Sequence, residues 1–214
     1  MRQIIYVKYN RTRSEKFQLK TAIVRENGAL SVEKTALTEA GAGHMGSFWE
    51  KYQMIREQNP RIRFLEPEFK DGGKTVCFRY LEGETLADAL ADRIHMGQIP
   101  YEELERVMAL VFPEDFSVDS GHFSIKEQTG GPFAPSQGFT EVFGPVPEGL
   151  EELGRLTAAP NVDGLFENLM ISDGHVYGID YEWVFDMEIP ARFLHYRNLL
   201  YFYRRCEASV SSAQ

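Results

Sequence analysis

The sequence has few cysteines and no excess of basic residues. Its two cysteines, Cys77 and Cys206, have no CxxC or Cys/His spacing around them, which excludes a disulfide framework and a Cys/His zinc site. Lys and Arg number 23 against 32 Asp and Glu, which gives a formal net charge of -9 at pH 7. Because binding along a nucleic acid depends on clustered Lys and Arg, we expect no nucleic-acid partner.

Long apolar runs are absent as well. No segment approaches the roughly 20 consecutive apolar residues that a membrane-spanning helix needs. The apolar run within the first residues, Met1 to Tyr6, is too short for a secretory signal. We therefore expect a cytoplasmic protein with no membrane span, and its 214 residues are enough for one large domain or two small lobes.

Residues 1–81 are patterned as a sheet with one helix, and we predict that they form the first lobe. Glu26-Asn27-Gly28 is a turn sequence between two alternating runs, which favours a hairpin. Apolar residues at helical spacing predict a helix over 44–58, and Asn59-Pro60 ends it. The predicted strands cover 17–25, 29–37, 62–69 and 75–81.

Lys34 is the unusual residue of the second predicted strand. Alternation places it on one face with the apolar residues Leu30, Val32 and Ala36. Such a lysine either extends its ammonium group to solvent at the strand end or has a function on that face. The pattern alone leaves both interpretations open.

Residues 82–214 are predicted to form the second lobe. Residue spacing, a Thr cap and a helix-starting Pro predict three helices, from Thr85 to about His95, from Pro100 to about Phe112, and from beyond Pro190 to about Arg205. Between them, residues 113–147 are rich in Gly, Pro, Ser and Phe. An insertion of this length is typical of a functional loop or of a segment with short structure of its own.

The segment that contains Asn168 and Asp180 is the most informative part of the sequence. Two short apolar runs flank Asp173-Gly174, a dipeptide that suits a two-residue hairpin loop. This register places Asn168 opposite Ile179 and therefore close to Asp180. Two oxygen ligands of the kind that Mg2+ prefers would then meet at the open end of one hairpin.

Asp163 lies five residues before Asn168. In a kinase catalytic loop, this spacing presents an Asp that orients the acceptor beside an Asn that binds the metal. Asp and Asn are common residues, so the spacing alone also fits a hairpin that merely carries turn-favouring polar residues. The apolar hairpin that follows and ends in Ile-Asp makes the kinase interpretation more specific.

These residues carry a resemblance to a known family. The runs 161–171 and 176–183 resemble the catalytic loop and metal-binding motif of the aminoglycoside phosphotransferase and choline kinase branch of the protein-kinase-like superfamily. More closely, the sequence resembles small bacterial kinase-like domains associated with surface-polysaccharide glycosyltransferases and methyltransferases. Their Ile-Asp-x-Glu-Trp phrase stands here at 179–183, and their later Pro-x-x-Phe-x-x-x-Arg phrase matches Pro190, Phe193 and Arg197.

The resemblance implies a fold, an activity and partners. The fold would be α+β and two-lobed, with an antiparallel sheet in the first lobe and a reduced, mainly helical second lobe. The activity would be ATP-dependent and Mg2+-dependent phosphoryl transfer to a hydroxyl of a sugar, a glycan or another small molecule. A scaffold of this reduced size could still catalyse the transfer if residues 113–147 hold the acceptor. A glycosyltransferase or methyltransferase of polysaccharide biosynthesis would be the protein partner.

The resemblance also implies roles for single residues. Asp163 would orient or deprotonate the acceptor hydroxyl, and Asn168 and Asp180 would hold the metal. Lys34 would be catalytic too, because it would reach the α- and β-phosphates. The residues implied for nucleotide binding are Lys34, its ion-pair partner Glu50, Val32 beneath the adenine, and the hinge residues Arg79, Tyr80 and Leu81. Glu39 and Glu57 compete with Glu50 for the pairing role.

Departures from the family pattern keep a second function open. The segment 8–13 contains no Gly where a glycine-rich phosphate loop is expected, and Asn161 replaces the usual His before the catalytic Asp. These departures favour a catalytically silent pseudokinase that binds nucleotide or a partner as a scaffold in polysaccharide assembly. Arg197 either braces the catalytic loop through an ion pair or is an ordinary helix-face arginine.

Overall fold

The computed structural model describes residues 1–98, 101–126, 133–146 and 155–211. Contacts between Cα atoms divide the chain into two compact units. The first comprises Met1–Arg56 and Phe64–Glu82, and the second comprises Glu57–Arg63 and Gly83–Gln214.

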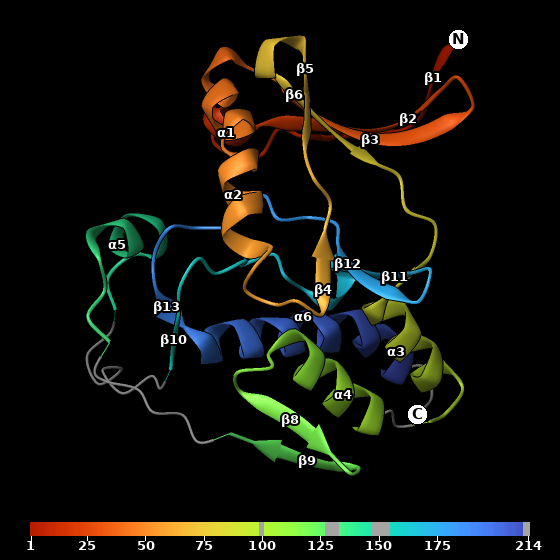
Figure 1. Cartoon of the computed structure of the whole chain (residues 1–214), viewed down its shortest axis with the longest axis vertical. Coiled ribbons are helices and arrows are strands. Elements are labelled where there is room, and N and C mark those ends of the chain that lie inside the picture. Colours follow the sequence, from red (N-terminus) through yellow and green to blue (C-terminus); the bar gives the residue numbers. More distant parts are fainter. Residues whose placement is uncertain (99–100, 127–132, 147–154, 212–214) are drawn as a thin grey trace. The chain divides into compact units, whose positions relative to one another are not determined.

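The first unit is built on a five-stranded antiparallel sheet with the strand order β1-β2-β3-β6-β5 (Figure 1). The strands are β1 (Arg2–Asn10), β2 (Leu19–Glu26), β3 (Ala29–Ala36), β5 (Glu68–Lys70) and β6 (Thr75–Arg79). Asn27 and Gly28 have φ angles of 52° and 85° between β2 and β3. Both are left-handed, as a two-residue hairpin loop requires, so the predicted hairpin is confirmed.

Strand β1 is the element that the sequence pattern did not predict. It pairs with β2 at the edge of the sheet, and eight of its nine residues are exposed. A strand that buries neither face has no alternation of apolar and polar residues, so periodicity could not reveal it. Its end is held by Arg2, whose Nη2 donates to Oε2 of the buried Glu33 at 2.6 Å.

The predicted helix over 44–58 is present as shorter pieces. They are α1 (Ala42–Gly46) and α2 (Phe48–Ile55), while η1 (Glu15–Phe17), η2 (Glu39–Gly41) and η3 (Asp71–Gly73) are single turns elsewhere in the unit. Met45, Phe48 and Ile55 are each 1% exposed, and these residues form the apolar core of the unit together with strand residues such as Val76.

The strand predicted over 62–69 is two strands in the structure. Its first part, β4 (Ile62–Phe64), begins in the Glu57–Arg63 segment of the second unit and pairs there with β12 (His175–Gly178), and its last part, β5, pairs with β6. Pro67 lies between them and has no N–H to donate to a ladder, which explains the interruption.

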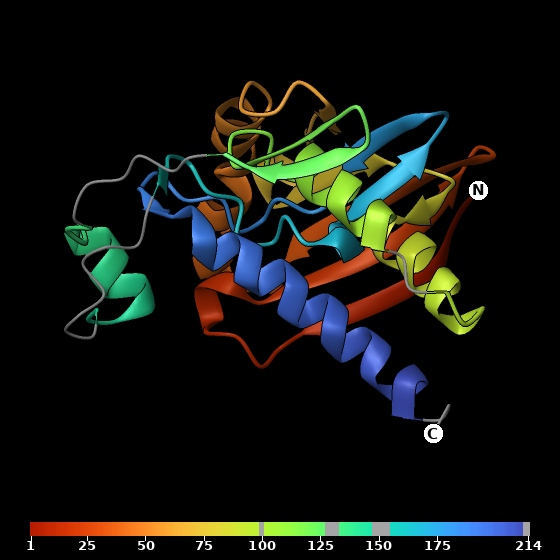
Figure 2. The same cartoon turned by 90° about the horizontal axis from the view of Figure 1, so that it is seen from below.

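The second unit is mainly helical. Its helices are α3 (Leu86–His95), α4 (Tyr101–Val111), α5 (Gln137–Phe143) and α6 (Ala191–Ser211), and α3 packs against α6 (Figure 2). Thr85 caps α3 as predicted, because its Oγ1 accepts a hydrogen bond from the Asp88 N–H at 3.0 Å. Helix α6 continues to Ser211 instead of ending near Arg205.

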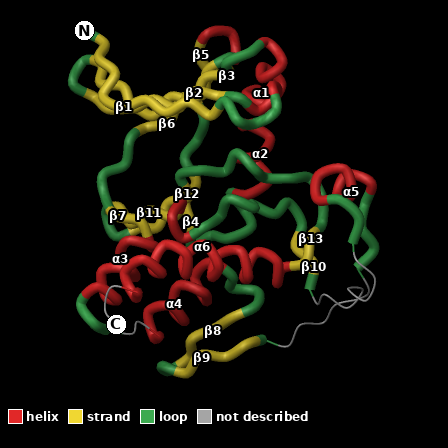
Figure 3. The backbone as a smooth tube through the Cα atoms, turned by 180° about the vertical axis from the view of Figure 1, so that it is seen from behind, coloured by secondary structure: helices red, strands yellow, loops and turns green. Residues whose placement is uncertain are grey.

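Short strands complete the second unit (Figure 3). One sheet has the order β4-β12-β11-β7, with β7 (Glu84–Thr85), β11 (Leu169–Ser172) and β12 (His175–Gly178). Two further pairs are β8 (Phe116–Asp119) with β9 (His122–Ile125), and β10 (Leu156–Thr157) with β13 (Ile189–Pro190).

The chain is thus an α+β protein with an antiparallel sheet in its first unit and a mainly helical second unit, as predicted. Residues 113–147 contain the β8–β9 hairpin and α5, although 127–132 and 147 lie outside the described residues. Within the described ranges, no helix combines the length and the apolar character needed to cross a membrane.

Candidate active site

The predicted hairpin of the second unit forms in the expected register. Ser172 pairs with His175, and Asp173-Gly174 form the turn with φ angles of 48° and 71°. Two positive φ angles are the signature of a type I′ loop, which the Asp-Gly step favours. The Asn168 carbonyl accepts a hydrogen bond from the Ile179 N–H at 3.0 Å, so the pairing continues one residue beyond the strands.

Asn168 is fixed to the backbone of Asp163. It closes the short helix η4 (Phe166–Asn168), and its Nδ2 donates to the Asp163 carbonyl at 2.8 Å. Since the amide nitrogen makes this bond, the amide oxygen points away from the Asp163 carbonyl. The five-residue spacing between Asp163 and Asn168 is therefore closed into one loop by this hydrogen bond.

Arg197 of α6 braces this loop at Asp163. Its Nε donates to the Val162 carbonyl at 2.8 Å, and its Nη2 lies 3.3 Å from Asp163 Oδ1. On the other side, Asn161 Oδ1 accepts a hydrogen bond from the Asp163 N–H at 3.2 Å. Side chain and backbone of Asp163 are thus held from two directions, which is what an acceptor-orienting residue needs.

Asn198, the next residue of α6, holds the following part of the loop and was not among the predicted site residues. Its side chain is buried, donates to the Gly164 carbonyl at 3.2 Å and accepts from the Phe166 N–H at 3.0 Å. The sequence contained no signal for this role, because the partners are 34 and 32 residues away.

Acidic side chains gather around Asp163. Asp180 follows β12, and its Oδ1 accepts a hydrogen bond from the Glu182 N–H at 3.3 Å. The chain after Asp180 lies beside the loop that carries Asp163, since the Trp183 carbonyl accepts a hydrogen bond from the Val162 N–H at 3.0 Å. Burial raises the pKa of Asp163, and the negative charges of Asp180 and, to a smaller extent, Glu182 raise it further. Arg197 opposes this rise without cancelling it.

The donor atoms at the hairpin mouth fit a Mg2+ ion. An amide oxygen from Asn168 and a carboxylate from Asp180 are hard ligands, and Mg2+ is commonly held by one or two side chains with water and phosphate oxygens around it. Across the described ranges there is no group of three or more His, Cys, Asp and Glu side chains placed to hold a metal. A cation at this hairpin would therefore complete its shell with non-protein oxygens.

The nucleotide-binding residues implied by the resemblance lie in the first unit. Lys34 is only 5% exposed, and its Nζ lies 6.0 Å from the centroid of the Phe48 ring. Val32 is two residues earlier on the same face of β3, and Glu50 is exposed on α2. Arg79 and Tyr80 are exposed and Leu81 is buried at the end of β6. Their roles, including the Lys34–Glu50 pair, stay predictions.

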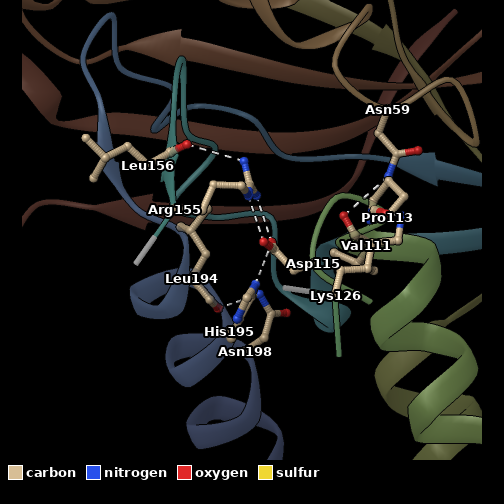
Figure 4. Close-up of polar contacts among 10 residues, drawn as sticks. All are labelled: Asn59, Val111, Pro113, Asp115, Lys126, Arg155, Leu156, Leu194, His195 and Asn198. Carbon is tan, nitrogen blue, oxygen red and sulfur yellow. Dashed lines mark hydrogen bonds and ion pairs between the residues drawn. The ribbon is translucent and has the colours of Figure 1, made fainter. Parts of the chain in front are cut away.

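A second polar cluster of the second unit, centred on Asp115, was missed by the sequence analysis (Figure 4). The Asp115 carboxylate is fully buried, receives two hydrogen bonds of 2.7 Å from Arg155 and lies 3.0 Å from His195 Nε2. Burial alone raises the pKa of Asp115, but the bonds from Arg155 and His195 outweigh it and lower the pKa to about 2. Such a satisfied ion cluster is typical of a structural element.

Comparisons with known proteins give solved structures as matches, but no family model and no curated protein. The macrolide 2'-phosphotransferase MphH from Brachybacterium faecium is 10% identical with a TM-score of 0.37, over 94% of this chain and 77% of that chain. The aminoglycoside phosphotransferase APH(4)-Ia is 12% identical with a TM-score of 0.40, over 95% and 78%. A thermostable mutant of APH(4)-Ia, in complex with ADP and hygromycin B, gives 12% and 0.36 over 95% and 79%. Similarities at this level do not place the chain in a family.

Proposed function

We propose that this protein is an ATP-dependent phosphotransferase that uses Mg2+ and acts on a hydroxyl of a sugar, a glycan or another small molecule. The observation that carries the proposal is the arrangement of Asp163, Asn168 and Asp180 around one hairpin. The Asn168 amide is bonded to the backbone of Asp163, and the charge of Asp180 is close enough to raise the Asp163 pKa. Phosphoryl transfer depends mainly on positioning and charge stabilisation, so few groups are needed.

Each of these residues has a chemical role in the proposal. Asp163 would orient the acceptor hydroxyl and take its proton while the oxygen attacks the γ-phosphorus of ATP and the bond to ADP breaks. Its raised pKa brings the carboxylate closer to the range in which a general base works well. Asn168 Oδ1 and the Asp180 carboxylate would hold Mg2+, which when bound supplies positive charge to the phosphate oxygens.

The first unit would contribute the nucleotide-binding residues. A lysine that is 5% exposed on a strand face is uncommon, because burying an ammonium group is costly unless it is paired. This burial supports the phosphate-binding role of Lys34, with Val32 beneath the adenine. The sequence resemblance suggests a glycosyltransferase or methyltransferase of polysaccharide assembly as the protein partner.

Thermal unfolding with and without Mg-ATP tests the proposal. A ligand at about one hundred times its Kd stabilises a protein by about 2.7 kcal/mol, so the Tm of the native protein should rise clearly. The rise should be lost in Asp180→Ala and kept in Asp186→Ala, which removes an exposed carboxylate six residues later. No rise in the native protein would contradict nucleotide binding and with it the phosphotransferase.

A pseudokinase is the second candidate, and the β1–β2 connection favours it. Residues 11–18 contain no Gly, and Gln18 Nε2 donates to the carbonyls of Arg11 and Arg13 at 3.2 and 3.0 Å. The connection thus lacks the glycines with which a kinase loop presents backbone N–H groups to phosphate, and the Gln18 side chain ties down two of its carbonyl groups. Mg-ATP binding without ATP turnover on any hydroxyl acceptor would support this scaffold function over the enzyme.

A further inference from the structure

A cavity of about 540 Å3 lies at the start of α6, within the second unit. Five aromatic rings line it, namely Phe133, Phe139, Phe143, Phe193 and Tyr196. Arg192 is the one charged residue of the described lining, and the lining contains no carboxylate. Ligand pockets commonly measure roughly 300–1,000 Å3 and are mainly apolar, so both size and lining suit a small molecule.

The walls of this cavity are held in place by ring contacts. Centroids of neighbouring rings are 5.0 Å apart for Phe133 and Phe139, 4.9 Å for Phe139 and Phe143, and 5.9 Å for Phe143 and Phe193. Ser136 caps α5, since its Oγ accepts a hydrogen bond from the Phe139 N–H at 3.1 Å. These contacts join α5 and the start of α6 into one aromatic wall.

Two connections place the cavity beside the candidate active site. Phe193 and Arg197 are four residues apart on α6, so they lie on one face of the helix, about 6 Å apart at Cβ. Arg197 in turn contacts the Asp163 carboxylate at 3.3 Å. In addition, Phe139 packs against the core cluster that includes Val162, the residue directly before Asp163.

Building on the proposed function, we propose that this cavity binds the body of the acceptor. The acceptor is then an uncharged alcohol with an aromatic or aliphatic ring system, whose hydroxyl reaches Asp163 while its apolar part fills the space between α5 and α6. A polycationic sugar would lose hydration in this cavity without gaining an ion pair from its described lining, which holds one arginine and no carboxylate. The described part of the insertion, residues 133–146, would thus favour apolar acceptors over charged ones through its phenylalanine side chains.

Binding of a fluorescent apolar alcohol, 2-(2-naphthyl)ethanol, tests the site without nucleotide. We expect saturable binding to the native protein, a loss of at least tenfold in affinity in Phe193→Glu, and less than a twofold change in Tyr203→Glu. Tyr203 is a matched control, because it is 62% exposed on the same helix and lies outside the cavity.

Phosphoryl transfer to the same alcohol tests the acceptor class. With Mg-ATP, the γ-phosphoryl group should move to the alcohol oxygen, leaving ADP and a proton, and Phe193→Glu should slow this at least tenfold. Faster transfer to an aminoglycoside that Phe193→Glu leaves unchanged would overturn the proposal while the phosphotransferase stands. Equal probe binding in the native protein, Phe193→Glu and Tyr203→Glu would also overturn the acceptor proposal. So would probe binding without transfer to the alcohol in a protein that phosphorylates another acceptor. Failure of the phosphotransferase itself is seen separately, as the absence of a Mg-ATP effect on Tm or as the absence of ATP turnover on every hydroxyl acceptor, aminoglycosides included.

Discussion

The second unit contains two aspartates that each contact an arginine, and their surroundings differ in kind. Asp115 receives two 2.7 Å bonds from Arg155 and a third contact from His195, and its pKa falls to about 2. Asp163 has one contact of 3.3 Å with Arg197 and feels the charge of Asp180, and its pKa rises. A buried carboxylate whose charge is balanced by hydrogen bonds and positive neighbours stabilises a fold. A buried carboxylate whose charged form is disfavoured, so that its pKa is raised, is typical of a functional site.

Helix α6 joins the two regions. His195 contacts Asp115, while the next turn provides Arg197 and Asn198 to the loop that carries Asp163. A cluster whose polar groups are all hydrogen-bonded therefore anchors the helix that holds the Asp163 carboxylate in position. Rigid support of this kind keeps a catalytic group in its working geometry.

The largest expected effect is on catalysis at Asp163. Asp163→Asn should lower kcat by about 10²- to 10⁴-fold, because the amide cannot accept the acceptor's proton. The same change should leave the free energy of unfolding at pH 7 unchanged or higher, since it removes a carboxylate whose pKa is raised by burial and by Asp180. Steady-state ATP turnover and urea unfolding measure the two effects. A kcat within threefold of the native value would remove Asp163 from the mechanism.

The comparison predicts the opposite result at Asp115. Asp115→Asn should lower the free energy of unfolding by about 2–4 kcal/mol, because Arg155 and His195 lose their buried counter-charge. Asp119→Asn changes an exposed carboxylate three residues after Phe116 and serves as the control. Urea unfolding of both variants measures the difference. Equal stability of the two would show that the Asp115 cluster is not structural.

Acid should act mainly through Asp115. Its folded pKa of about 2 lies below the usual 3.8, so its contribution to stability is present above about pH 4 and is lost as the pH falls towards 2. The shift corresponds to about 2 kcal/mol. Urea midpoints between pH 6 and pH 2 should therefore fall more steeply in the native protein than in Asp115→Asn. Parallel curves would assign the acid sensitivity to other carboxylates.

The smallest effect is expected at Arg197. Its charge lowers the pKa of Asp163, so Arg197→Gln should raise that pKa and move the acidic limb of the pH–rate profile to higher pH. Arg197→Lys keeps the charge and should move the limb less, although it loses the paired contacts to Val162 and Asp163. Identical profiles in native and Arg197→Gln would mean that Arg197 does not tune Asp163.

The surroundings of Asp163 and Asp115 also differ in how far they could be predicted from the sequence. The hairpin at Asp173-Gly174 and the spacing of Asp163 and Asn168 were predictable because turn chemistry and short spacing are local properties. The Asp115 cluster joins residues 40 and 80 positions apart, and no local pattern reports such contacts. Sequence separation also hid the role of Asn198.

Three further differences between the predicted and the observed structure have causes that are only partly visible in the sequence. Strand β1 escaped prediction because it is exposed on both faces, so no periodicity marks it. Pro67 was a visible signal that the run over 62–69 would be broken into two strands. The aromatic lining of the cavity was present as a Phe-rich composition over 113–147, but its pairing with Phe193 of α6 depends on tertiary packing.

The central claim is that Asn168 and Asp180 hold one divalent cation, and it can be measured directly. Mn2+ can replace Mg2+, and electron paramagnetic resonance of free Mn2+, titrated with protein and measured against a baseline with ATP alone, reports how much Mn2+ the protein binds. Asn168→Ala and Asp180→Asn should each weaken Mn2+ binding at least tenfold, while Asp186→Asn should bind like the native protein. Native-like binding in all three variants would contradict the account.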